Sequence, residues 1–174
     1  MAVHPFATDL GWFAVRGTGA TVTHVTIGHP GPDAALEAIR AAAGTSDEEV
    51  RDWRPELTDA LARFAAGEPV DLEAFPVPTP PTRFARRVVA ELRRVPRGET
   101  VSYAELAARA GSPNAARAVG GVMRTNRTPL LVPCHRVVGA GGRLGGFSAP
   151  TGIELKKRLL ALEAVPGAAP VGRG

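Results

Sequence analysis

A proline-rich stretch near the middle of the chain constrains its folding more than any other sequence feature. Prolines stand at positions 69, 76, 78, 80 and 81. Because proline lacks a backbone donor and has a fixed φ, residues 68–81 are unsuited to a helix or an interior strand, and they show no sustained apolar period. We therefore predict two domains: residues 1–81, an N-terminal α/β domain ending in this linker, and residues 82–174.

The two parts differ sharply in charge. Residues 1–81 contain five arginines against twelve acidic residues, a net charge of −7, whereas residues 82–174 contain sixteen basic residues against five glutamates, a net charge of +11. These values make up the total of +4. Only the second part is suited to a polyanion. The alternative at this point is that its charges simply cover a solvated surface.

Cysteine usage and hydropathy limit the class of protein. The single cysteine, Cys134, excludes an intramolecular disulfide and a multi-cysteine metal site, and it favours a reducing compartment. No apolar run approaches the roughly 20 residues that a membrane span requires, and Asp9 interrupts the N-terminus before a signal-type stretch forms. We expect a soluble, cytoplasmic protein without a membrane partner.

The first part is predicted to form a small antiparallel sheet with helices. Residues 11–27 are rich in Val, Thr and aromatics around a glycine turn at residues 16–20, a pattern typical of a β-hairpin. Residues 33–43 and 55–66 each begin beside a proline and end at a glycine, which indicates two helices.

The second part is predicted to be mostly helical. Residues 83–95 place apolar side chains on one helical face and arginines on the other. Ser102 and Glu105 fit a capping box for a helix that runs to Ala110. Gly111 then ends this helix, and Pro113 begins another that continues to residue 125, which together predict a helix-turn-helix.

The last part of the chain is predicted to bury one segment and one helical face. Residues 130–138 are too short and apolar for a surface helix, so we expect a buried extended segment, followed by a glycine-rich loop. Residues 151–164 predict an amphipathic helix with Leu155, Leu159 and Leu162 facing inward. The tail from Val165 is expected to be disordered.

The pentapeptide of residues 133–137 is the most informative for chemistry. A cysteine reacts as thiolate, and a neighbouring base such as His135 promotes its ionisation. On an extended strand adjacent side chains diverge, so His135 would reach Cys134 through a bend or a water. Glu163, at the inner end of the last helix, is our choice over Glu154 to orient the imidazole. Taken singly, each of these residues also fits a structural role: a small buried thiol, a core histidine and a solvated helix end.

Several stretches in fixed order resemble the O6-alkylguanine-DNA alkyltransferase family over residues 84–163. They are Val101-Ser-Tyr103, Ala115-Ala-Arg-Ala-Val-Gly-Gly121, Met123-Arg124, Asn126, Pro133-Cys-His-Arg-Val-Val138, Gly146-Phe147-Ser148 and Leu159-Leu160, with Glu163 following. Ordered matches are far more specific than one motif. The expected fold is α+β: a small ribonuclease H-like N-terminal antiparallel sheet with helices, joined to a mostly helical C-terminal domain with a winged-helix-like helix-turn-helix.

The resemblance implies stoichiometric DNA repair. The Cys134 thiolate takes the alkyl group from O6-alkylguanine in double-stranded DNA, a thioether forms, and each molecule reacts once without a cofactor. The nucleotide is flipped out of the duplex, and Arg117 fills its place. Tyr103 turns the phosphate and donates to guanine. The second helix enters the minor groove, with DNA contacts at Ser112, Ala115, Ala116, Gly120 and Arg124. The resemblance also implies that Ser148 contacts guanine near O6, that Asn126 braces the active-site turn, and that the substrate pocket is lined by Pro129, Met123, Val137 and Phe147.

Other sequence features bear on related functions. Some relatives bind zinc in the N-terminal part, but here only His4, His24 and His29 are candidates, so we expect no metal. No phosphotriester-sensing domain is evident, which argues against a regulator. The competing hypotheses are a cysteine hydrolase, for which no oxyanion hole is evident, and a binder of alkylated DNA without transfer, whose known representatives lack the reactive cysteine. We expect a monomer. Cooperativity on DNA, the range of alkyl groups and activity on O4-alkylthymine stay open.

Overall fold

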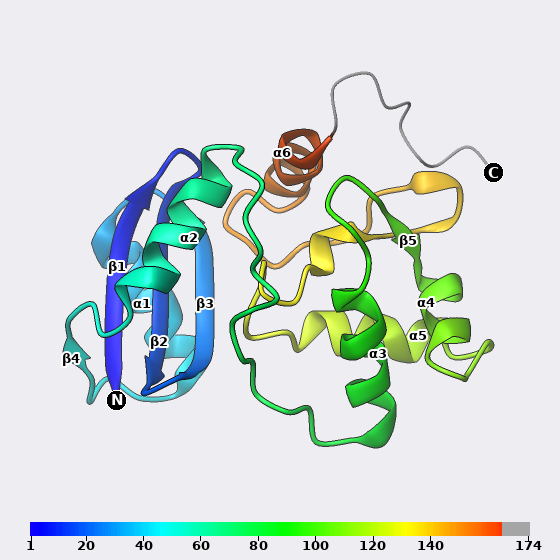
Figure 1. Ribbon diagram of the computed structural model, residues 1–174, viewed down its shortest axis with the longest axis horizontal. Helices are drawn as coiled ribbons and strands as arrows, with labels where there is room; N and C mark the ends of the chain where they lie inside the picture. The colour runs from blue at the N-terminus through cyan, green and yellow to red at the C-terminus, as the bar shows by residue number, and fades with distance from the viewer. Residues whose placement is uncertain (165–174) are drawn as a thin grey trace. The chain divides into compact units, whose positions relative to one another are not determined.

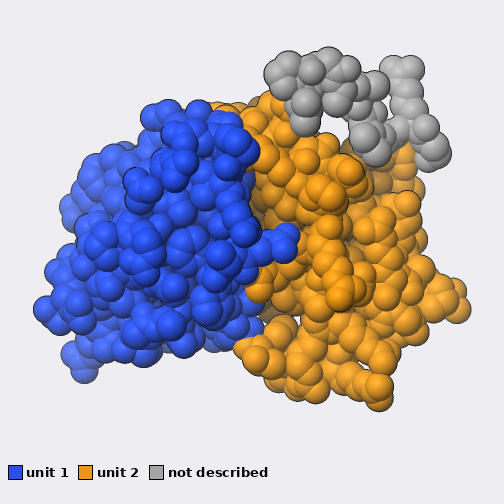
Figure 2. All heavy atoms as spheres, viewed as in Figure 1, with its two compact units in different colours: residues 1–78, 127–131, 149–151 blue, residues 79–126, 132–148, 152–174 orange. Residues whose placement is uncertain are grey.

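The computed structural model describes residues 1–164 and divides into two compact units (Figures 1 and 2). Unit 1 comprises residues 1–78, 127–131 and 149–151, and unit 2 comprises residues 79–126, 132–148 and those from 152 onward. Two short later segments are thus grouped with the first unit. The predicted domain boundary between residues 81 and 82 implies that each domain folds on its own, and it stays a prediction. The tail from Val165 lies outside the described residues.

Unit 1 is built on a four-stranded sheet. Its strands are β1 (Ala2–Thr8), β2 (Gly11–Thr18), β3 (Thr21–His29) and β4 (Glu49–Val50), in the order β3-β2-β1-β4. The predicted hairpin is confirmed as β2 and β3, which pair antiparallel. Strand β1, which contains Pro5, was not predicted. Pro5 pairs with Ala14 of β2, whereas β4 pairs only with Ala2 and Val3 of β1. The edge of β1 at Pro5 is therefore not paired with β4, and the absence of a backbone N–H on Pro5 breaks no hydrogen bond there.

Two helices cover the opposite faces of this sheet (Figure 1). Helix α1 (Pro32–Ala43) and helix α2 (Pro55–Ala65) confirm the two predicted helices, each with proline in its first turn. Ala35 and Ile39 of α1 form a core cluster with Val3 and Ala14 of the sheet. Because neighbouring side chains on a strand alternate in direction, Phe13, which is fully buried, lies on the other face.

The segment 68–81 contains no helix or strand, as its prolines predict. Its first half is nevertheless packed into unit 1, because Leu72 and Phe75 are buried. The guanidinium carbon of Arg54 lies 5.1 Å from the centre of the Phe75 ring, which is a cation–π contact. This half of the segment therefore belongs to the fold of unit 1.

The three candidate zinc histidines stand on two strands. His4 is in β1, and His24 and His29 are in β3, where they pair with Arg16 and Trp12 of β2. Within residues 1–164, no group of three His, Cys, Asp or Glu side chains is arranged to hold a metal ion.

Unit 2 is mostly helical. Its elements are α3 (Arg83–Arg93), β5 (Val101–Ser102), α4 (Tyr103–Arg109), α5 (Ala116–Arg124), the 3₁₀ turn η1 (Cys134–Arg136), β6 (Val137–Val138), the 3₁₀ turn η2 (Ala140–Gly142) and α6 (Ile153–Glu163). The capping box is confirmed: the Ser102 hydroxyl accepts from the Glu105 amide, and the Glu105 carboxylate accepts from the Ser102 amide. Strands β5 and β6 pair in parallel beside these helices.

Three predicted boundaries or conformations in unit 2 were wrong. Helix α5 begins at Ala116 and not at Pro113, because residues 112–115 close a turn with the Ala115 amide donating to the Ser112 carbonyl. Residues 134–136 form the turn η1 where an extended segment was expected. Helix α6 spans Ile153–Glu163, and Leu162 on it is only half-buried.

The α+β fold class is confirmed by this arrangement of a small sheet with helices and a mostly helical second unit. No helix within residues 1–164 combines the length and the apolar character needed to cross a membrane.

Candidate active site

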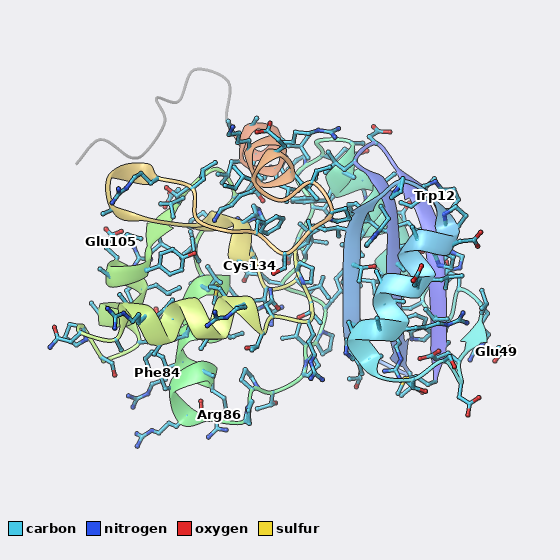
Figure 3. All side chains as sticks on the ribbon, turned by 180° about the vertical axis from the view of Figure 1, so that it is seen from behind. Trp12, Glu49, Phe84, Arg86, Glu105 and Cys134 are labelled. Carbon is cyan, nitrogen blue, oxygen red and sulfur yellow. The ribbon has the colours of Figure 1, made fainter. Side chains whose placement is uncertain are left out.

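Cys134 stands at the first position of η1, directly after the apolar segment that ends at Pro133 (Figure 3). The turn is closed by the Arg136 amide, which donates to the Pro133 carbonyl at 2.9 Å. The side-chain amide of Asn126 donates to the Val132 carbonyl at 3.0 Å and holds the segment that leads into the turn. Because η1 bends the chain at Cys134, neighbouring side chains no longer alternate as they would on a strand.

Cys134 is a half-buried residue, and its thiol is surrounded by groups that favour its anion. Loss of hydration raises the pKa of the thiol above its ordinary value. A hydrogen bond from Asn126, the positive charge of Lys156 and the backbone amides of Cys134 and His135 act in the opposite direction and lower this pKa. The sequence predicted a thiol acidified by His135. The structure instead gives a net upward shift, because desolvation outweighs the stabilising contacts.

His135 and Glu163 form a buried pair. Nε2 of His135 lies 3.0 Å from Oε1 of Glu163, and both side chains are almost completely buried. Burial lowers the pKa of His135, although Glu163 raises it, so the imidazole is neutral at physiological pH. Since an ionised Glu163 can only accept, the hydrogen of the neutral ring resides on Nε2. The lone pair is then on Nδ1, which is the nitrogen able to take a proton.

Glu163 has a second partner that the sequence did not reveal. Nε and Nη2 of Arg136 lie 3.0 Å and 2.7 Å from the two carboxylate oxygens of Glu163, and Nη1 donates to the Val95 carbonyl at 2.7 Å. Burial raises the pKa of Glu163, but the hydrogen bonds and charges of His135 and Arg136 outweigh it and lower the pKa to about 2. Glu163 is therefore ionised across the physiological range.

Lys156 is the functional candidate that sequence reasoning missed. Its side chain is 1% exposed, and Nζ donates to the Val137 carbonyl at 2.7 Å, immediately after η1. Burial lowers the pKa of Lys156, and the neighbouring Cys134 raises it. One signal in the sequence was available, because Lys156 precedes Glu163 by two helical turns and so shares its face of α6.

Tyr103, the first residue of α4, lies close to the same site. Burial raises the pKa of its phenol, and the charge of a Cys134 thiolate raises it further. The phenol oxygen is 3.2 Å from the position that a Cβ on Gly145 would occupy, so the glycine-rich loop passes directly over the ring. The phenol is therefore protonated at physiological pH and able to donate.

The structure thus brings together Cys134, His135, Glu163, Tyr103 and Asn126, five of the predicted site residues. The predicted DNA-contact residues lie on α5 and on the turn before it, where Arg117 and Arg124 are exposed and Ser112, Ala115, Ala116 and Gly120 are half-buried. Of the predicted guanine-binding residues, Ser148 is exposed on the loop, Met123 and Phe147 are half-buried, Val137 is fully buried in β6, and Pro129 belongs to a segment of unit 1.

Comparisons with known proteins agree on one family. A family model described as "6-O-methylguanine DNA methyltransferase, DNA binding domain" matches residues 83–165. A Methanosarcina acetivorans protein named methylated-DNA–protein-cysteine methyltransferase is 41% identical over 142 residues, which are 76% of this chain and 88% of that protein. The crystal structure of Mycobacterium tuberculosis OGT in complex with DNA is similar with a TM-score of 0.75 and 30% identity, covering 98% of this chain and 96% of the other.

Mammalian relatives match over a shorter part. The mouse protein of the same name is 46% identical over 114 residues, which are 62% of this chain and 54% of the mouse protein. The match thus spans about half the length of that curated relative.

Proposed function

Because the chain belongs to the O6-methylguanine-DNA methyltransferase family, we propose that it repairs DNA by moving the alkyl group of O6-alkylguanine onto the sulfur of Cys134. The observation that carries this proposal is the arrangement around η1: the half-buried Cys134 with Asn126 and Lys156 beside its thiol, followed by a buried His135–Glu163 pair. A nucleophile, a base and a group that orients the base are the components that such a transfer requires.

The thiol first loses its proton. Since the pKa of Cys134 is raised, most of the free protein carries a protonated thiol at neutral pH. The thiol transfers this proton to Nδ1 of His135, directly or through a water. The ionised Glu163 stabilises the imidazolium that forms, through the contact at Nε2. Lys156 and the amides of η1 stabilise the thiolate that remains.

The thiolate then attacks the alkyl carbon. A sulfur–carbon bond forms, the bond between that carbon and O6 breaks, and its electron pair stays on the guanine. Tyr103 donates a proton to the departing base and regains one from the imidazolium through solvent, so the products are a thioether at Cys134 and a normal guanine. A thioether has no easy route to hydrolysis, so each molecule acts once.

DNA is the proposed partner of the helix-turn-helix α4–α5. The target carbon lies inside a duplex, so the nucleotide must be rotated out, and the exposed Arg117 of α5 is our candidate to take its place in the stack. Ser112, Ala115, Ala116, Gly120 and Arg124 would contact the DNA backbone. Asn126 would brace the turn at Cys134, and Ser148, Met123 and Phe147 would contact the base, whereas Val137 is fully buried and can only support them. Because the reaction needs a reduced thiol, we propose that the protein acts in the cytoplasm.

Methyl capture tests the transfer. We expect a duplex with one O6-methylguanine to add one methyl group to the peptide containing Cys134, in equal molar amounts, as measured by mass spectrometry of a digest. The Cys134→Ala variant should bind the duplex with unchanged affinity and capture nothing. An unmodified Cys134 peptide after incubation with excess duplex would overturn the proposal, and repeated hydrolysis of an activated ester would indicate a cysteine hydrolase instead.

The role of Arg117 is tested separately. Because its side chain is exposed, Arg117→Ala should leave thermal unfolding unchanged while it slows transfer from duplex DNA. Transfer from the free base O6-methylguanine, which needs no flipping, serves as the internal control and should be unaffected. Equal rates on duplex DNA would remove this assignment.

A further inference from the structure

We propose that the exposed face of α3 binds the DNA phosphate backbone beside the lesion and so extends the DNA-binding surface beyond the helix-turn-helix. This face, the α3 arginine face, consists of Arg83, Arg86, Arg87 and Arg94. The inference rests on the proposed function in that it takes DNA as the partner. It adds a contact that the reaction itself does not require.

The helical period gathers these arginines on one side. Ala85, Val88 and Leu92 of α3 are buried against unit 2, and the four arginines are exposed on the opposite side. At 1.5 Å per residue, the distance along the axis from the first to the last arginine is about 16 Å. Figure 3 marks Arg86 at the outer end of this helix.

The face has little negative charge to balance it. Within residues 1–164, no carboxylate lies within 4.0 Å of the guanidinium groups of Arg83, Arg86 or Arg87. Arg94 pairs with Glu91 at 2.8 Å, but its side chain remains 73% exposed. The positive potential of this face is therefore available to a partner.

Helix stability does not explain the arginine at the start of α3. The N-terminal end of a helix carries a partial positive charge and favours acidic side chains. Helix α3 has no acidic residue in its first turn and instead begins with Arg83, which that charge repels. Arg86 donates to the carbonyls of Pro80 and Pro81 at 3.1 Å and 3.0 Å, which holds its guanidinium in place.

One member of the face reaches the helix-turn-helix. Nη1 of Arg87 is 3.2 Å from the position that a Cβ on Gly111 would occupy. Gly111 lies in the turn between α4 and α5 and has a φ of 82°, which glycine adopts without strain. The α3 arginine face is thus continuous with the turn that leads into α5.

A phosphate backbone fits this face better than an acidic protein segment. Phosphates recur about every 3.4 Å along the axis of each DNA strand, so a face about 16 Å long spans several of them. Arginine suits this contact, since its planar guanidinium matches a phosphate with two parallel hydrogen bonds. The continuity with α4–α5 places the contact on the duplex that α5 would engage.

The test is the salt dependence of binding by the full chain. We expect Arg83→Gln/Arg86→Gln/Arg87→Gln to weaken binding to an O6-methylguanine duplex at least about tenfold and to make the slope of log K against log salt shallower by about 0.9 for each phosphate that the variant no longer neutralises. The control, Arg51→Gln/Arg63→Gln/Lys157→Gln, removes the same charge from exposed side chains elsewhere and should change neither the affinity nor the slope appreciably.

Two further measurements keep this proposal distinct from the repair activity. Thermal unfolding and methyl capture from free O6-methylguanine should be the same in the triple variant as in wild type. Single methylphosphonate substitutions that weaken wild-type binding should have no further effect in the triple variant at the phosphates that α3 contacts. Equal slopes for the triple variant and its control would overturn the α3 contact, for instance in favour of an acidic protein partner, even if methyl capture succeeds. Failure of capture with an altered slope would overturn only the repair function.

Discussion

The reactivity of Cys134 depends on opposing effects at a single sulfur. Burial disfavours the thiolate, whereas Lys156, Asn126 and two backbone amides favour it. Lys156 is the only full positive charge among these groups. Its own burial lowers its pKa, so a proton on Lys156 and a negative charge on Cys134 stabilise each other. We therefore infer that Lys156 sets the pH at which the thiol becomes reactive.

Replacing this lysine tests its role. Lys156→Met keeps most of the buried volume and removes the charge, so the pKa of Cys134 should rise further. We expect methyl transfer at neutral pH to slow about tenfold, the effect of one pKa unit, and the midpoint of its pH profile to move upward. Lys157→Met, at an exposed neighbouring position, is the control. A slower rate with an unchanged pH midpoint would show that Lys156 acts only through packing.

Glu163 links the site to stability at low pH. Its pKa in the folded protein is about 2, below the ordinary value of a glutamate, so the folded state binds a proton at Glu163 only at a lower pH than the unfolded state does. This contribution is present in full above the ordinary pKa of about 4.3 and is lost as the pH falls towards 2. It amounts to about 3 kcal/mol at neutral pH.

The corresponding variant is Glu163→Gln. Denaturant unfolding should show a lower free energy of unfolding at neutral pH, because Arg136 and His135 lose a buried counter-charge, and a weaker loss of stability between about pH 4.5 and pH 2 than in wild type. Glu154→Gln changes an exposed side chain of the same helix and should follow the wild-type curve. An unchanged acid dependence in Glu163→Gln would contradict the low pKa.

At the scale of elements, α4 and α5 show which helix signals determine a boundary. The capping box of Ser102 and Glu105 satisfies two backbone amides, and the helix begins where it predicts. Pro113 is compatible with a first helical turn but also with a β-turn. The hydrogen bond from the Ala115 amide to the Ser112 carbonyl closes a β-turn at Pro113, so α5 begins at Ala116. A proline alone is the weaker signal.

The glycines of α5 allow stability and DNA binding to be separated. A Cβ on Gly120 would lie 4.0 Å from the Tyr103 ring, which is ordinary contact, and one on Gly121 would meet nothing within 4 Å. Each change to alanine should therefore raise stability by about 0.5–1 kcal/mol. If Gly120 permits close approach to DNA, Gly120→Ala should also weaken duplex binding, whereas Gly121→Ala, the control, should not. Thermal unfolding measures the change in stability, and a binding titration measures the affinity for the duplex. Equal affinity of the two variants would contradict the proposed role of Gly120.

At the scale of the whole molecule, the segment between the units is partly structural. Phe75 is buried and stacked against Arg54, although the surrounding prolines predict only a linker. Phe75→Ala should lower the free energy of unfolding by about 3 kcal/mol and increase cleavage after Glu73 by a glutamate-specific protease. Val77→Ala, at a half-buried position nearby, should have a smaller effect on both. If the Phe75→Ala variant resisted the protease as well as the wild type does, other contacts would be holding this segment.

The distribution of charge also belongs to the whole chain. All of the excess positive charge follows residue 81, and the four members of the α3 arginine face account for a quarter of the sixteen basic residues there. The proposals for α5 and α3 together give this excess a physical use, since each phosphate neutralised adds to the salt dependence of binding.

The α+β class and most helices could be predicted from the sequence, and Cys134, His135 and Glu163 could be selected as candidates, because periodicity, caps and adjacent reactive residues are local properties of the chain. The three-dimensional structure was needed to find the 3₁₀ turn at Cys134, the strand that contains Pro5, the two hydrogen bonds from Arg136 to Glu163 and the burial of Lys156 beside the thiol. These depend on which distant groups meet in space and on the hydration each loses there. Spacing along the chain does not encode that balance of desolvation against hydrogen bonding.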